Sequence, residues 1–159
     1  MTVDEHELVW VARAVELARE ALEAGDEPFG SVLVAHDGTV LFEDRNRTSG
    51  GDDTRHPEFE IARWAAENVP AADRARTTVY TSGEHCPMCS AAHAWVGLGR
   101  IVYAASSAQI VGWREGWGLP PGPVAALPVT AIAPGIPVDG PVAGFDEDVR
   151  RLLELAARA

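Results

Sequence analysis

The sequence predicts an α/β protein, a three-layer α/β/α sandwich in which helices cover both faces of a mixed sheet of about five strands. Helical and β-rich stretches alternate along the 159 residues, as is typical of layered domains. An Asp37-Gly38 turn signal between two short β-rich runs predicts one antiparallel pair. Two later helices each begin at a proline that follows a polar motif.

The first half of the chain shows two helical patterns around the hairpin. Residues 4–24 repeat apolar side chains at the spacing of a helix with one buried stripe, and Gly25 ends this helix. Pro57 favours the start of a second helix, which we expect to run to residue 69. The stripe of the first helix consists of Leu8, Val11, Ala12, Val15, Ala18 and Leu22. The expected strands of the hairpin are residues 31–35 and 40–42, and the polar loop that follows is residues 45–55.

The second half alternates strands with helices and then becomes rich in proline and glycine. A helix over residues 87–98 is expected between two strands, and a capped helix follows from Ser106 or Ser107 to about residue 117. Residues 119–144 are the Pro/Gly-rich segment, and residues 146–158 are expected to form a final amphipathic helix. The strands expected in this half are residues 77–82, 100–105 and 129–133. We expect a single domain over residues 1–159.

Composition excludes several classes of protein. The net charge is −11 and all 13 basic residues are arginines, so a nucleic-acid partner is disfavoured, because such partners are held by basic patches. No run of about 18 apolar residues is present to span a membrane. The acidic start of the chain does not resemble a signal peptide, and we expect a cytoplasmic protein.

Three potential zinc ligands precede or open two of the predicted helices. Cys86 and Cys89 are the only cysteines, which argues against a disulfide framework and favours a metal or redox site. His56 precedes Pro57 at the start of one helix, and the two cysteines lie at the start of the next. Helices packed side by side on a sheet bring their N-termini together, so we expect His56, Cys86 and Cys89 to bind one Zn²⁺ per chain. Three protein ligands and one water are the usual arrangement at catalytic zinc.

Glu58 lies two residues after His56, on the first turn of the same helix. From there it reaches the metal-activated water without being a ligand, and it is the expected catalytic residue for proton transfer. This chemistry suits hydrolytic removal of an amino group from an aromatic ring.

The pattern His56-x-Glu58, then 27 residues, then Cys86-x-x-Cys89 resembles the zinc-dependent cytidine deaminase-like superfamily. Further matches are Pro28-Phe29-Gly30, Asn46, Thr81-Ser82-x-Glu84 and Pro87-Met88. The chain looks most like the branch of guanine deaminases, cytosine deaminases and transfer-RNA adenosine deaminases. The resemblance implies that Asn46 hydrogen-bonds the base or its sugar, that Phe29 lies close to the pocket, and that the protein is a homodimer.

The sequence also departs from that family's pattern. His85 stands where relatives usually have proline, and Pro57, which has no backbone N–H, stands where many have alanine. Gln109 lies where guanine deaminase-like members tend to place a carboxylate, and it offers both a donor and an acceptor. We expect His85, Gln109 and Trp113 to contribute to substrate binding, with Trp113 as an aromatic wall.

The expected function is therefore zinc-dependent hydrolytic deamination of a small guanine- or cytosine-like nucleobase or nucleoside. The alternatives are a transfer-RNA adenosine deaminase and a non-catalytic, zinc-stabilised interaction module. A thioredoxin-like redox motif would leave His56 and Glu58 unexplained. His93, four residues after Cys89, is either a fourth ligand or a packed core histidine.

Overall fold

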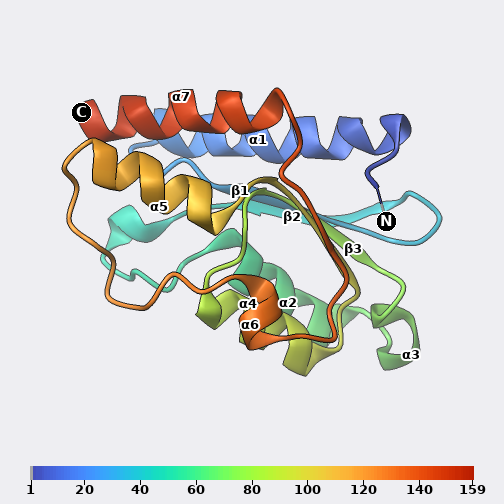
Figure 1. Cartoon of the computed structure of the whole chain (residues 1–159). Coiled ribbons are helices and arrows are strands. Elements are labelled where there is room, and N and C mark those ends of the chain that lie inside the picture. The colour runs from blue at the N-terminus through green and yellow to red at the C-terminus, as the bar shows by residue number, and fades with distance from the viewer. Residues whose placement is uncertain (1) are drawn as a thin grey trace.

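The structure is a computed structural model that describes residues 2–159, and it confirms the three-layer α/β/α architecture (Figure 1). The five-stranded mixed sheet has the order β2-β1-β3-β4-β5. β1 is antiparallel to both β2 and β3, whereas β3, β4 and β5 run parallel to one another. The strands are β1 (Gly30–Val34), β2 (Val40–Arg45), β3 (Thr78–Gly83), β4 (Arg100–Ala105) and β5 (Val138–Asp139).

The helices form the two outer layers of the sandwich. α1 and α7 lie side by side over one face of the sheet together with α5, and α2, α4 and α6 lie on the opposite side (Figure 1). These helices are α1 (Leu8–Glu23), α2 (Pro57–Asn68), α4 (Pro87–Val96), α5 (Ser107–Gly116), α6 (Val129–Ile132) and α7 (Phe145–Arg158). The short elements are η1 (Glu5–Glu7), η2 (Thr48–Gly50) and α3 (Ala71–Arg74).

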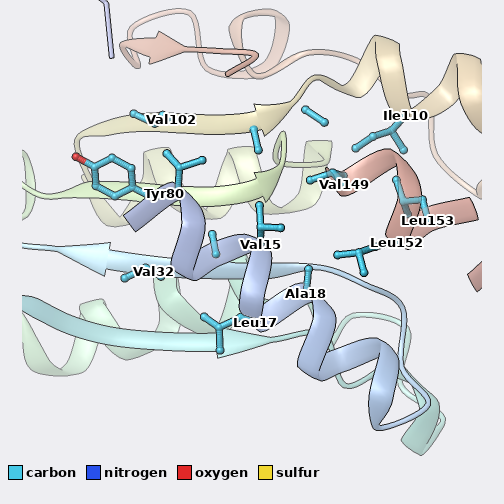
Figure 2. Packing of buried hydrophobic residues seen from close by; sticks show 14 of the residues in the cluster. Val15, Leu17, Ala18, Val32, Tyr80, Val102, Ile110, Val149, Leu152 and Leu153 are labelled. Atoms are coloured by element: carbon cyan, nitrogen blue, oxygen red, sulfur yellow. The ribbon is translucent and has the colours of Figure 1, made fainter. Parts of the chain in front are cut away.

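Strand residues point alternately to the two faces and supply two separate cores. Val32, Tyr80 and Val102 face α1 and join Val149 and Ile110 from α7 and α5 (Figure 2). The intervening strand residues pack on the other face. The cluster on that face contains Leu33, Val79, Ile61, Ala65, Val69 and Leu98. A third, smaller cluster contains Ile101, Val129 and Ala133.

Two details differ from the sequence prediction. Residues 129–132 form the short helix α6 instead of a strand, and the fifth strand is the two-residue β5. Val129 is fully buried in α6 and its backbone N–H donates to the Glu84 carboxylate at 2.9 Å, so a tertiary contact decides the conformation of this β-branched stretch. In α1 the predicted stripe residue Ala12 is exposed, and Ala14, Leu17 and Ala21 are buried instead.

The start of β1 and the ends of β2, β3 and β4 meet at one edge of the sheet, because Gly30 pairs with Arg45 and Gly83 pairs with Ala105. α1 packs so closely at Gly30 that an added Cβ would lie 2.4 Å from the Cβ of Leu17. Among residues 2–159, no helix is long and apolar enough to cross a lipid bilayer.

Candidate active site

The starts of α2 and α4 converge at this sheet edge and bring the three predicted ligands together. His56 is the N-cap of α2 and Cys86 is the N-cap of α4, and a proline follows each of them as the first helical residue. Cys89 lies in the first turn of α4 and is fully buried. Both helix N-termini therefore direct their partial positive charge toward the sulfurs, which favours thiolates.

The ligand atoms have the spacing of a zinc site. Nδ1 of His56 lies 3.6 Å from Sγ of Cys86 and 3.5 Å from Sγ of Cys89, and the two sulfurs are 3.6 Å apart. Zinc bound tetrahedrally, at about 2.3 Å from sulfur and about 2.0–2.1 Å from nitrogen, places two sulfurs about 3.8 Å apart and sulfur and nitrogen about 3.6 Å apart. In the described part of the chain, His56, Cys86 and Cys89 are the only such group of metal-ligating side chains.

The electrostatics of the three side chains also fit a divalent cation. A hydrogen bond from Cys89, aided by His56, lowers the pKa of Cys86 to about 4. The same contact, together with burial, raises the pKa of Cys89, since two neighbouring thiolates repel each other. The hydrogen bond with Cys86 raises the pKa of His56. A cation among these atoms offsets the repulsion and holds both thiolates and a neutral imidazole.

Glu58 lies beside the ligands but is not one of them. Its side chain is buried under the sheet edge, and this burial raises the pKa of the carboxyl group above its usual range. Oε1 lies 2.8 Å from Thr81 Oγ1 and 3.2 Å from Ser31 Oγ, both on strands. Among residues 2–159, no other side chain hydrogen-bonds Oε2, and the carboxyl group has one further hydrogen bond, from the backbone N–H of Glu58 itself. A buried carboxyl with one oxygen held and one free is suited to moving a proton.

Asn46 and Phe29 lie together at the same sheet edge. The backbone N–H of Asn46 donates to the Phe29 carbonyl at 3.0 Å, and the Asn46 residue is only 3% exposed. Oδ1 of Asn46 accepts from the backbone N–H and the hydroxyl of Thr48, at 3.0 and 2.8 Å. Since Oδ1 is occupied, Asn46 offers its Nδ2 donor. The Phe29 ring packs over Gly83, at the end of β3.

His85 is buried and is not part of the ligand group. Its ring packs edge-on against His93, with centroids 5.3 Å apart, and its two nitrogens have no hydrogen-bond partner in the described chain. Nε2 of His93 lies 2.7 Å from the Gly99 carbonyl oxygen, so His93 is a packed core histidine and is not a ligand. Burial lowers the pKa of both imidazoles, and both are neutral at pH 7. The substrate role of His85 stays a prediction.

Gln109 and Trp113 each have a structural role in the fold, Gln109 in capping α5 and Trp113 in the core. Oε1 of Gln109 accepts from the Ser106 N–H at 2.8 Å in a capping box, and Nε2 donates to Asp146 at 3.0 Å. Trp113 is half-buried and packs with Trp117 against the core under α1 and α7. The substrate roles of Gln109 and Trp113 stay predictions, and neither side chain needs a ligand to explain its position.

Four residues shape this edge although the sequence patterns assign them no role in the site. Ser31 and Thr81 hold Glu58, and Thr48 orients Asn46. Glu84 accepts from Ser107 N–H and Val129 N–H, both at 2.9 Å, and so ties the starts of α5 and α6 to the loop before Cys86. Ser31 and Thr81 could have been found from the sequence by one feature. Side chains alternate between the two faces of a strand, and this alternation places both hydroxyl groups on the face that packs in the core.

A five-stranded mixed sheet with imidazole and thiolate ligands at two adjacent helix N-termini defines a zinc-binding α/β protein. Residues 4–105 match the model of the cytidine and deoxycytidylate deaminase zinc-binding region. This match covers more than half of the chain, and the chain belongs to that family. His56, Cys86 and Cys89 are its candidate zinc ligands.

The relatives of this chain are named as deaminases of different substrates. A probable cytosine deaminase of Schizosaccharomyces pombe is 29% identical over 69% of this chain and 66% of its own length. The guanine deaminase of Bacillus subtilis is 39% identical over 60% of this chain and 62% of its own length. The matches therefore span less than two thirds of either relative. Transfer-RNA adenosine deaminases are also similar to this chain.

A solved structure of guanine deaminase from Nitrosomonas europaea shares the fold. It superposes with a TM-score of 0.71, and the match covers 100% of this chain and 88% of the other at 22% identity. At that identity the likeness shows the fold alone.

Proposed function

We propose that this protein is a zinc-dependent hydrolytic deaminase of a small nucleobase or its nucleoside. The reaction replaces an exocyclic amino group with a carbonyl group, consumes one water and releases ammonia. The observation that carries the proposal is Glu58, a buried carboxyl group beside three zinc ligands but outside the ligand set. A purely structural zinc site has no need of such a group.

Zinc, when bound by His56, Cys86 and Cys89, supplies the Lewis acid that activates water at neutral pH. Glu58 accepts a proton from the attacking water at Oε2 and gives it to the ring nitrogen. It then takes the hydroxyl proton of the addition product and gives it to the amino group, which leaves as ammonia while the carbonyl group forms. Oε1 stays on Thr81 and Ser31 during these transfers. Asn46 positions the ring through its Nδ2 donor.

The charges around the site favour an uncharged substrate. Three arginines lie in the segment before His56, and each is paired with a carboxylate inside the fold. The pairs are Arg45 with Asp26 at 2.8 Å, Arg47 with Asp44 at 3.1 Å and Arg55 with Glu60 at 3.2 Å. Because a phosphate needs free cationic donors, this pairing supports a base or nucleoside as substrate over a nucleotide or RNA.

Ammonia release from the zinc-loaded protein tests the proposal. The panel contains guanine, cytosine, isocytosine, adenine, their nucleosides and an adenosine-bearing RNA stem-loop, with Glu58→Ala as the blank. Turnover of a base or nucleoside that vanishes in the blank supports the proposal. Turnover of the stem-loop alone identifies an RNA deaminase, and no ammonia from any substrate contradicts deamination of these rings.

Asn46→Asp is expected to raise KM by about 10- to 100-fold with a smaller change in kcat, which corresponds to the loss of one substrate hydrogen bond. The reason is that Thr48 keeps one oxygen of the new carboxylate, so the other oxygen presents an acceptor where the substrate meets a donor. Steady-state kinetics on the best substrate measure the change. Asn68→Asp, an exposed site at the end of α2, is the matched control with an expected wild-type KM. An unchanged KM in Asn46→Asp contradicts the substrate contact.

We propose further that the protein is a homodimer in which α4 contacts the second copy. Trp95 on α4 is 90% exposed, on the helix that carries Cys86 and Cys89. Sedimentation velocity is expected to give twice the chain mass of 17.0 kDa, and Trp95→Glu is expected to give the monomer. Val9→Glu, an exposed site on α1 in the opposite layer, serves as the matched control and should remain dimeric. A monomeric wild-type protein contradicts the dimer.

A further inference from the structure

Two hydroxyl groups interrupt the apolar face of the sheet directly beneath Glu58. Ser31 on β1 and Thr81 on β3 are cross-strand partners, and both residues are fully buried. Alternation along the strands places them on the same face as Leu33 and Val79, which form the core under α2. Buried hydroxyls need hydrogen-bond partners, and the partner shared by these two is the Glu58 carboxyl group.

The hydrogen bonds converge on one oxygen of Glu58. Ser31 Oγ lies 2.8 Å from Thr81 Oγ1, and Thr81 Oγ1 lies 2.8 Å from Glu58 Oε1. Ser31 Oγ also lies 3.2 Å from Oε1, and the Gly83 carbonyl lies 2.9 Å from Thr81 Oγ1. Each hydroxyl has a single proton. Oε1 receives the Thr81 proton when Ser31 donates to Thr81, and it receives the Ser31 proton when Thr81 donates to the carbonyl of Gly83 or Gly30.

We propose that Ser31 and Thr81 are positioning residues that fix Oε1 of Glu58 and so reserve Oε2 for the proton transfers of the reaction. This inference rests on the proposed function, in which Glu58 moves protons. Oε1 accepts a hydroxyl proton both when Glu58 is a carboxylate and when Oε2 carries a proton. The carboxyl group therefore keeps one orientation through the cycle, which is the preorganisation that proton transfer requires.

The two hydroxyls are partly redundant, because either one can donate to Oε1. Removal of one leaves the other as donor, whereas removal of both leaves the buried oxygen with no side-chain donor in the described chain. The two losses are therefore expected to be non-additive. Asn46, which contacts the substrate in the proposed function, lies outside this pair, so the loss should appear in kcat and not in KM.

The test compares zinc-loaded Ser31→Ala, Thr81→Val and the double variant with wild type. Each single variant is expected to lower kcat by about 3- to 10-fold and the double variant by about 10³-fold, more than the product of the singles. KM should stay within about 3-fold. Thr81→Ser retains the hydroxyl and should restore a kcat near wild type. Ser82→Ala removes a neighbouring buried hydroxyl that accepts from Gly30 N–H, so it controls for a general packing effect and should retain kcat.

Crystal structures of the same variants give a readout that is independent of activity. The Glu58 carboxyl group is expected to rotate in the double variant and to keep its wild-type orientation in Thr81→Ser and Ser82→Ala. An unchanged orientation in the double variant, or a kcat equal to wild type, overturns the inference. If wild type releases no ammonia, the proposed function fails while the orientation of Glu58 still decides the positioning role. If the double variant does not fold, Ser31→Ala and Thr81→Val are each measured alone, and a wild-type kcat in both overturns the inference.

Discussion

Glu58→Gln is expected to abolish ammonia release, by a factor of at least about 10³, and to leave the zinc content at the wild-type level. Glutamine has nearly the same shape, and its amide oxygen still accepts from Thr81 and Ser31. The amide nitrogen then occupies the place of Oε2, where it neither accepts nor returns a proton at neutral pH. Zinc is retained because Glu58 is not among the ligands.

Metal analysis, single-turnover kinetics and a melting curve on the same sample check this result. Glu60→Gln is the matched control, since it makes the same change two residues further along α2 and removes only the pair with Arg55. It should keep turnover, zinc and fold. Substantial turnover by zinc-loaded Glu58→Gln would show that another group moves the protons, and the assignment of the catalytic residue would be wrong.

Most of the fold follows from local patterns in the sequence. The hairpin, α2, β3, α4, β4, α5 and α7 lie within a few residues of their predicted ranges, because each carries a periodic pattern with a start or stop signal. The prediction of a strand over residues 129–133 is wrong, because residues 129–132 form α6. Their β-branched composition favours a strand, but Pro128 and the Glu84 carboxylate fix the start of a helix there.

The metal ligands could be predicted because their chemistry and their position at helix starts are both local. His56, Cys86 and Cys89 lie within 4.8 Å of one another, as the two motifs indicate. Substrate contacts depend on tertiary packing, which a single sequence does not contain. The ring of His85 packs on His93 and the Gln109 amide caps α5, and the substrate roles of both residues stay predictions.

The hydroxyls beneath Glu58 show the same limit. Ser31 looks like an ordinary strand residue in the sequence, and the family resemblance includes Thr81 without giving it a role. Only the antiparallel register of β1 and β3 makes the two residues cross-strand partners. That register places both under α2, where Glu58 reaches them. The sequence pattern indicates two buried hydroxyls at core-facing strand positions, and only the fold shows that they share Glu58 as a partner.

Cys86→Ala is expected to lower the zinc content from about one ion per chain to a small fraction and to lower the melting temperature. Cys86 and Cys89 both bring α4 beside His56 of α2, and without Cys86 only His56 and Cys89 remain as ligands. Because zinc binds the folded chain and not the unfolded one, it stabilises the fold by about 4 kcal/mol at a thousand-fold excess over Kd. The variant loses most of this stabilisation. Metal analysis after dialysis, with melting curves, measures both effects.

A chelator separates the loss of zinc from the loss of the side chain. Treated wild type should melt near Cys86→Ala, and treated Cys86→Ala should not change further, because it has no bound zinc to lose. Met88→Leu, a half-buried change between the two cysteines, should keep both the zinc and the chelator response. Glu58→Gln should also keep them, so the two variants divide the site into a metal-binding part and a proton-transfer part. A wild-type zinc content in Cys86→Ala would show that the ligand set is wrong, whatever its activity.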